Sequence, residues 1–167
     1  MGLFLHSSYP AMAIELALYQ PDIAQNTGTL LRLGACIGTR VHLIHPAGFA
    51  VTRQGLKRAG LDYLDHAELV EHVSFAEFDA FRRAAGRRLV LLTTKASIPV
   101  YEAEFNADDI LLLGRESAGV PQAVADIADL RLRIPMRQSM RSLNVAIAAA
   151  LVLGEAKRQT GEWSALS

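Results

Sequence analysis

Short apolar runs alternate along the chain with longer segments in which apolar residues recur every three or four positions. This alternation is typical of a parallel β-sheet covered by helices. It predicts strands in the segments 14–19, 40–45, 88–94, 109–114 and 130–135. It predicts helices over 27–36, 53–58, 74–85, 121–127 and, longest of all, 143–159. The expected fold class is therefore α/β, with a parallel sheet flanked by helices.

Local signals support several of the expected helix ends. Ser74 and Glu77 have the spacing of a capping box, in which the two residues satisfy each other's backbone N–H groups. Gly38 and Gly161 stand where left-handed C-terminal caps belong. Ser142, just before the last helix, suits an N-terminal cap, which is the plain structural interpretation of that residue.

Length and composition predict one domain. The chain has 167 residues, of which 51% are hydrophobic and 20% charged, and this is enough for one substantial core. We expect a single domain over residues 14–161, preceded by a flexible extension at 1–13 and followed by a tail at 162–167. The extension has too short an apolar run to span a membrane, and Met12 is a second candidate for the start of the protein.

The charge balance and the cysteine count limit the partners. Seventeen basic and seventeen acidic residues cancel, so any nucleic acid has to be held by a local basic patch rather than by the overall field. Cys36 is the single cysteine, and alone it forms neither an internal disulfide nor a thiolate metal cluster. We therefore expect a cytoplasmic protein that binds neither a metal nor a membrane.

The segment "LLLGRESAGVP", residues 111–121, is rich in glycine and follows an apolar run. Gly114 and Gly119 have the spacing of a Walker A loop, but the Lys and the Ser or Thr that hold phosphate and magnesium are missing after Gly119. The dinucleotide fingerprint G-x-G-x-x-G is also missing after the first strand. Glu116 in the middle of the segment would oppose a phosphate group. The segment is therefore either a tight turn whose glycines permit positive φ, or a loop for a ligand without phosphate.

Two further loops lead from a strand to a helix and carry polar residues. In "QPDIAQNTGTLLRLGACIG", Asn26 stands at a helix start and Arg32 follows six residues later among leucines. An arginine buried alone is costly, so the plain interpretation of Arg32 is a solvated helix face. In "RIPMRQSMRSLNVAIAAALVLGEAKR", a polar loop brings Ser142 and Asn144 to the start of an alanine-rich helix.

Taken in order, these three loops resemble the motifs of the SPOUT superfamily of RNA methyltransferases, and most closely those of its small tRNA 2'-O-methyltransferases of the TrmL (YibK) type. The resembling segments are "PDIAQNTGTLLRLGACIG", "LLLGRESAGVP" and "LRIPMRQSMRSLNVAIAAALVLGEAKRQ", and the stretches "HPAGF", "LKRAGLDY" and "LTTK" are similar to the TrmL type in particular. The resemblance covers nearly everything after residue 13. It implies the SPOUT fold, in which the C-terminal part is threaded through a loop to form a trefoil knot, an exception to the rule that chains avoid knots.

The resemblance also implies a cofactor and a reaction. The cofactor is S-adenosyl-L-methionine, whose reactive centre is a sulfonium cation and which carries no phosphate, so a carboxylate nearby is tolerable. The reaction is methyl transfer to the ribose 2'-hydroxyl of a tRNA nucleotide, above all the wobble cytidine or uridine of the anticodon loop. Two alternatives stay open, an rRNA 2'-O-methyltransferase and a non-catalytic knotted RNA-binding protein.

By the same resemblance, individual residues acquire expected roles. The cofactor is expected against Leu92, Gly114, Ile134 and Ser142. The chemistry is expected from Arg32, Asn26, Ser142 and Asn144. A guanidinium normally stays protonated, so Arg32 is expected to stabilise a developing alkoxide rather than to act as a general base. Glu116 is expected to order its loop or a group of the RNA.

Two positions depart from the TrmL type. Gly154 stands where these proteins usually carry an aromatic residue, and "SLNVAIA" leans toward other 2'-O-methyltransferases of the superfamily. The target nucleotide therefore stays open between tRNA and rRNA.

The resemblance implies a homodimer that holds tRNA with both subunits. The small residues of "NVAIAAALVLGEA" suit close helix packing across a two-fold axis, and the alternative is a helix wholly buried in its own chain. A compact domain without an appended RNA-binding module needs basic residues from both copies to hold a stem-loop. The candidates, each with the plain alternative of a solvent-facing charge, are Arg53, Lys57, Arg58, Arg137 and Arg141.

Overall fold

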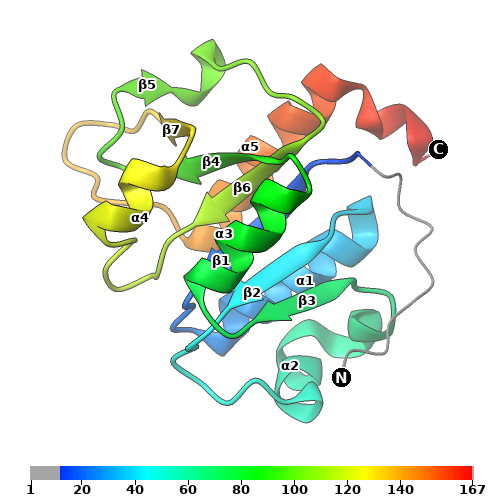
Figure 1. Cartoon of the computed structure of the whole chain (residues 1–167). Helices are drawn as coiled ribbons and strands as arrows, with labels where there is room; N and C mark the ends of the chain where they lie inside the picture. Colours follow the sequence, from blue (N-terminus) through cyan, green and yellow to red (C-terminus); the bar gives the residue numbers. More distant parts are fainter. Residues whose placement is uncertain (1–11, 167) are drawn as a thin grey trace.

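A parallel sheet organises the part of the chain that the computed structural model describes, residues 12–166 (Figure 1). Seven strands of these residues pair in the order β3-β2-β1-β6-β4-β7-β5, and every neighbouring pair is parallel. The strands are β1 (Glu15–Tyr19), β2 (Val41–Ile44), β3 (Leu69–His72), β4 (Arg88–Leu92), β5 (Ile98–Pro99), β6 (Asp109–Leu113) and β7 (Leu130–Arg133). The predicted parallel sheet flanked by helices is confirmed.

Helices cover both faces of this sheet. They are α1 (Ala24–Ile37), α2 (Arg53–Gly60), α3 (Phe75–Ala84), α4 (Gln122–Ile127) and α5 (Val145–Thr160), with the 3-10 helices η1 (Leu61–Asp65), η2 (Val100–Glu102) and η3 (Glu162–Ala165). Along β1, Leu16 and Leu18 pack in one apolar cluster with α1 and α5, whereas Ala17 and Tyr19 pack in a second cluster with α3 and α4. Because successive side chains of a strand point to opposite faces, the two clusters are the two sides of the sheet.

Two strands at the ends of the sheet are not predicted by the sequence pattern. β5 has two residues, which is too short for any periodicity. β3 pairs with β2 alone, and its sequence "LVEH" has only one buried residue. An edge strand lacks the continuous apolar run that identifies a strand buried on both faces. The five predicted strands correspond to β1, β2, β4, β6 and β7, each of which has a neighbouring strand on both sides.

The helix ends agree with the sequence signals except at the start of α5. The Ser74 hydroxyl accepts a hydrogen bond from the Glu77 N–H, and Gly38 and Gly161 cap their helices with φ of 65° and 75°. The prediction of Ser142 as an N-cap is wrong, because α5 begins at Val145 and Asn144 caps it. Among the described residues, no helix is long and apolar enough to cross a membrane.

The described part of the predicted tail, residues 162–166, packs against the domain. It begins with η3, and the Glu162 carboxylate accepts hydrogen bonds from the Ile14 N–H at 3.0 Å and from the buried Lys157 Nζ at 2.7 Å. Trp163 donates its indole N–H to the Gly154 carbonyl at 3.2 Å. The end of the domain is therefore tied to the start of β1. The expected N-terminal extension falls mostly outside the described residues, and Met12 and Ala13 are its only described members.

A buried row of ionisable groups crosses β1, β2 and β3. His42 lies 2.8 Å from a carboxylate oxygen of Glu15 through Nε2 and 2.9 Å from His72 Nε2 through Nδ1. Arg40 and Arg87 each lie 3.0 Å from the other carboxylate oxygen of Glu15. Burial and the neighbouring His42 lower the pKa of His72 from 6.5 to about 4.

The lowered pKa of His72 predicts a loss of stability in mild acid. In the unfolded chain His72 takes up a proton near pH 6.5, whereas in the folded chain it stays neutral until about pH 4. Stability is therefore full above pH 6.5 and falls as the pH drops toward 4, by about 3 kcal/mol at most. We expect the free energy of unfolding, measured by urea denaturation at pH 7.5 and pH 5, to fall less in His72→Gln than in the native protein. His66→Gln, at an exposed histidine, is the control. An equal fall in the free energy of unfolding between pH 7.5 and pH 5 in all three proteins would contradict the prediction.

Candidate functional site

The loops that follow β1, β6, β4 and β7 meet at one edge of the sheet. These strands are neighbours and parallel, so their carboxyl ends lie at the same edge, where ligands of open α/β sheets usually bind. A groove of about 1200 Å³ lies there. The three motif loops of the sequence all contribute to its lining.

The structure brings most of the predicted site residues to this groove. The four residues expected beside a cofactor all line it, and so do three of the polar residues. They are Leu92, Gly114, Ile134, Ser142, Asn26, Asn144 and Glu116. Ser142 is an exposed residue of the β7–α5 loop, whereas Leu92 and Ile134 are partly buried. The lining of the groove thus includes apolar side chains as well as amides, a hydroxyl and a carboxylate.

The glycine loop after β6 is a tight turn. Arg115 and Gly119 exchange two backbone hydrogen bonds, of 3.0 and 2.9 Å, and Gly119 has φ of 65°. A Cβ at Gly114 would lie 2.7 Å from both the carbonyl carbon and the Cα of Gly119. Glycine at 114 is therefore required by the close approach of the two ends of the turn. The turn and the ligand interpretations of this segment are compatible, because the turn lies on the groove.

A chain of hydrogen bonds links the three motif loops. Glu116 accepts from the Asp22 N–H at 2.7 Å and from the Asn26 side-chain amide at 3.3 Å. Asn26 in turn accepts from the Asn144 amide at 3.0 Å. Asn144 accepts from the backbone N–H groups of Ala146 and Ile147 at the start of α5. The side chain of Glu116 therefore joins the loop after β6 to α1, and through it to α5.

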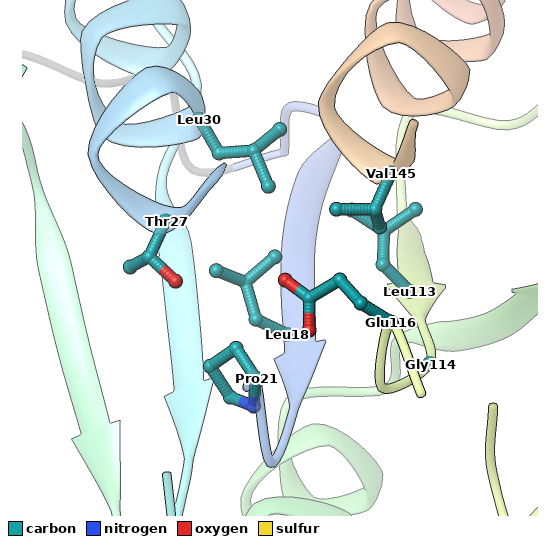
Figure 2. A pocket seen from close by; sticks show the side chains of 8 residues that line it. All are labelled: Leu18, Pro21, Thr27, Leu30, Leu113, Gly114, Glu116 and Val145. Atoms are coloured by element: carbon teal, nitrogen blue, oxygen red, sulfur yellow. The ribbon is translucent and has the colours of Figure 1, made fainter. Parts of the chain in front are cut away.

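The Glu116 carboxylate also faces a small cavity of about 10 Å³ beneath the groove. Figure 2 shows the Glu116 carboxylate between α1 and α5 and beside Leu18, with the Thr27 hydroxyl on the other side of Leu18. Thr27 is buried, and its hydroxyl has no hydrogen-bond partner in the described chain. A cavity of this size holds about one water molecule. The carboxylate is thus turned into the protein, between two helices, rather than out to solvent.

Arg32 lies apart from the other predicted catalytic residues. Its side chain is exposed, does not line the groove, and stacks with its guanidinium carbon 4.5 Å from the centre of the Tyr63 ring in η1. Asn26 and Arg32 are six residues apart on one helix, which is about 240° around its axis at 3.6 residues per turn. The described chain therefore brings Asn26, Ser142 and Asn144 together but leaves Arg32 on another face.

The five basic RNA candidates form two separate groups. Arg53 lies 2.5 Å from Asp65, and Lys57 lies 3.9 Å from Asp62, so two of the three α2 residues have acidic neighbours. Arg58 is exposed on the same helix. The other two, Arg137 and Arg141, are exposed in the β7–α5 loop, next in sequence to Met136 and Ser142, which line the groove. In Figure 1 this loop, in orange, and α2 lie well apart.

Sequence reasoning missed Asp22, which contacts the glycine loop from the β1–α1 loop. Its carboxylate accepts hydrogen bonds from Arg115 and Ser117. The aspartate in "PDIAQN" gives little signal by itself, because its partners are more than 90 residues further along the chain. Within residues 12–166, no group of three or more His, Cys, Asp and Glu side chains is arranged to hold a metal ion.

The family model described as the SpoU rRNA methylase family matches residues 13–154. This chain belongs to the SpoU methylase family. The match spans all three motif loops and every strand of the sheet, and it confirms the resemblance drawn from the sequence. The matched region also ends inside α5, so the groove lies wholly within the family's own domain.

Relatives similar to this chain are named as tRNA methyltransferases. A tRNA (cytidine(34)-2'-O)-methyltransferase of Beijerinckia indica is 62% identical over 146 residues, which cover 87% of this chain and 91% of that protein. The enzyme of that name from Escherichia coli K12 is 38% identical over 151 residues, covering 89% and 94%. These relatives align with nearly the whole of the described domain.

Solved structures share the fold of this chain. One, determined in a study of 2-OH methylation of C/U34 on tRNA, is 41% identical, has a TM-score of 0.84 and covers 90% of this chain and 97% of its own. An rRNA methyltransferase of Sinorhizobium meliloti with AdoMet bound has a TM-score of 0.81 at 26% identity, but this chain covers only 58% of it.

Proposed function

We propose that this protein transfers the methyl group of S-adenosyl-L-methionine to the ribose 2'-hydroxyl of the wobble cytidine or uridine, nucleotide 34, of tRNA. The observation that carries the proposal is the near full-length similarity to proteins named for cytidine 34. The rRNA alternative has weaker support, because the chain spans only 58% of the similar rRNA enzyme.

The chemistry of the groove fits S-adenosyl-L-methionine. Leu92 and Ile134 offer apolar surface for an adenine, and the turn at Gly114 lets backbone polar groups approach a ligand closely. The loops that line the groove have no phosphate-binding motif, and a cofactor without phosphate does not need one. When bound, the cofactor supplies an electrophilic methyl group. Asn26, Ser142 and Asn144, at the same groove, hold the ribose in position.

Positioning and electrostatics account for the chemistry assigned to this chain. Orientation of two reactants can lower a barrier by up to about 7–11 kcal/mol. A guanidinium normally stays protonated, so Arg32 would stabilise negative charge that develops on the 2'-oxygen, and water or a phosphate would take the proton. Because Arg32 does not line the groove of its own chain, the proposal assigns it to the groove of a second copy.

A homodimer supplies this second copy. Ile147 and Leu151 lie four residues apart on α5 and are 54% and 55% exposed. The alternative of a helix wholly buried in its own chain is therefore wrong, and this exposed apolar face supports packing against another copy. The trefoil knot in the C-terminal part stays a prediction, which the family supports. The cytoplasmic location also stays a prediction, which the free thiol of Cys36 supports.

Calorimetric titration with S-adenosyl-L-methionine, ATP and NAD separates the classes of function. The proposal requires binding of the first ligand and neither of the others. Binding of S-adenosyl-L-methionine without methylation of tRNA or rRNA would support the non-catalytic knotted RNA-binding protein instead. Binding of ATP or NAD alone would indicate an enzyme of small nucleotides.

The β7–α5 loop is expected to hold tRNA phosphates through Arg137 and Arg141. Each phosphate contact contributes about 0.7 to 0.9 to the slope of log affinity against log salt. Arg137→Ala and Arg141→Ala should each reduce this slope by about one contact and weaken tRNA binding, with cofactor affinity unchanged. Arg83→Ala, an exposed arginine on α3, is the matched control. If both loop variants retain the native slope and affinity, the RNA surface lies on another face.

A further inference from the structure

The Asp22 carboxylate, in the β1–α1 loop, accepts four hydrogen bonds. Its Oδ1 accepts from Arg115 Nε at 3.1 Å and from Arg115 Nη2 at 2.5 Å. Its Oδ2 accepts from the Ser117 N–H at 3.1 Å and from the Ser117 hydroxyl at 2.6 Å. Both oxygens of one carboxylate are thus used twice, by two residues of the glycine loop.

These two residues stand on either side of Glu116, and Asp22 holds that residue as well. The Asp22 N–H donates to the Glu116 carboxylate at 2.7 Å. The contacts are therefore reciprocal, because the backbone of Asp22 binds the side chain of Glu116 while the side chain of Asp22 binds its two neighbours. Three consecutive residues of the β6–α4 loop are fixed by one residue of the β1–α1 loop.

A third loop, the one that follows β2, packs against the backbone at Pro21 and Asp22. The Gly48 N–H donates to the Pro21 carbonyl at 2.8 Å, and a Cβ at Gly48 would lie 3.1 Å from the Cα of Asp22. Gly48 belongs to the stretch "HPAGF", which follows β2. The strands β2, β1 and β6 are adjacent in the sheet. The loops at their carboxyl ends therefore meet at Asp22.

The backbone before Asp22 is held in an unfavourable conformation. Gln20 has φ of 43°, in the left-handed region that residues with a side chain rarely adopt. Its N–H donates to the Ile44 carbonyl at 2.9 Å. Strain of this kind persists only where the surroundings fix it, and it gathers at functional sites. Here the turn at Gln20 directs the chain so that Asp22 reaches the glycine loop.

The charges at this junction require an ionised carboxylate. Hydrogen bonds from Arg115 and then Ser117 lower the pKa of Asp22 from 3.8 to about 2. Asp22 therefore carries its charge at neutral pH and in mild acid. The neutral amide of asparagine cannot accept from all these donors or balance the charge of Arg115.

We propose that Asp22 is a positioning residue, which holds Arg115, Glu116 and Ser117 in the shape that the groove needs for methyl transfer. The proposal rests on the proposed function and adds a residue to it. Asp22 does not line the groove, whereas the three residues that it holds do. Its effect is therefore expected on the cofactor side of the reaction and not on tRNA binding.

The test compares Asp22→Asn with Asp22→Glu and with Ser117→Ala in the full chain. With labelled S-adenosyl-L-methionine and a tRNA transcript, Asp22→Asn should lower kcat/KM for the cofactor about 10-fold or more and leave KM for tRNA within about 2-fold. Asp22→Glu, which keeps the charge, should recover part of the loss, and Ser117→Ala should lose less than Asp22→Asn. Asp126→Asn, at an exposed carboxylate 3.8 Å from Arg131, is the control for removing a charge.

A double-mutant cycle and hydrogen exchange distinguish positioning from general damage. If Asp22 and Arg115 act as a unit, Asp22→Asn with Arg115→Met should be no worse than the poorer single variant. Amide exchange in residues 115–119 should become faster in Asp22→Asn, with the exchange of β1 and β6 unchanged. Native kcat/KM in Asp22→Asn, additive effects in the cycle, or unchanged exchange would each overturn the proposal. If the native protein itself neither binds the cofactor nor methylates RNA, the proposed function fails, whatever the exchange reveals about the loop.

Discussion

Replacing Gly114 with alanine is expected to weaken S-adenosyl-L-methionine binding about 100-fold and to destabilise the fold. The new Cβ would lie 2.7 Å from two backbone atoms of Gly119, so the turn must open. Forcing extra atoms into a packed site typically costs about 1–3 kcal/mol, and about 2.7 kcal/mol corresponds to a 100-fold change in affinity. Calorimetric titration and urea denaturation measure the two effects.

Gly154→Ala provides the matched control for Gly114→Ala. Gly154 lies inside α5, and an added Cβ there meets no atom within 4 Å. Alanine in a helix interior is more favourable than glycine by about 1 kcal/mol. The control should therefore gain stability slightly and keep the affinity for the cofactor. Cofactor affinity in Gly114→Ala equal to that of the control would mean that the glycine turn does not shape the binding site.

Replacing Arg32 with lysine is expected to reduce turnover about 100-fold or more and to leave the affinity for S-adenosyl-L-methionine nearly unchanged. Loss of one donor to a developing oxyanion typically costs about 100- to 1000-fold in kcat. A lysine is a point charge and lacks the planar fork of donors that can hold a phosphate and a ribose together. Arg32 does not line the groove of its own chain, and in the groove of the second copy it is assigned to the ribose and phosphate, so cofactor binding should not depend on it. Single-turnover methylation and calorimetry measure the two quantities.

Arg83→Lys controls for the change of an exposed arginine elsewhere on the surface. It should match the native protein in both measurements. A loss of cofactor affinity in Arg32→Lys as large as its loss of turnover would move Arg32 into the cofactor site. Native turnover would leave Arg32 as a solvated residue stacked on Tyr63.

The central strands could be predicted from the sequence because they are buried on both faces. β1 and β6 consist of buried residues throughout, and such runs contrast strongly with their polar neighbours. The edge strands β3 and β5 could not be predicted, because pairing on one side alone leaves no distinctive pattern. At the start of α5, Ser142 and Asn144 are both good capping residues, and only the backbone decides that Asn144 is the cap.

The lining of the groove could be predicted only through the family resemblance. The hydrogen bonds that link the loops around the groove could not be predicted. Leu92 and Ile134 follow different strands, and their closeness depends on the order of strands in the sheet. The contacts of Asp22 with Arg115 and Ser117 span 93 and 95 residues. The position of Arg32 outside the groove follows from helix geometry, because six residues do not return to the same face. Tertiary structure decides the first two, and local helix geometry decides the third.

Nucleoside mass spectrometry of methylated tRNA tests the central claim most directly. Unmodified tRNA transcripts are incubated with the protein and with S-adenosyl-L-methionine that carries an isotopic label in its methyl group, and site-specific fragments are then digested to nucleosides. The account predicts labelled 2'-O-methylcytidine or 2'-O-methyluridine in the fragment that contains nucleotide 34 and in no other. Label on a base, label at another position, or label in rRNA but not in tRNA would contradict it.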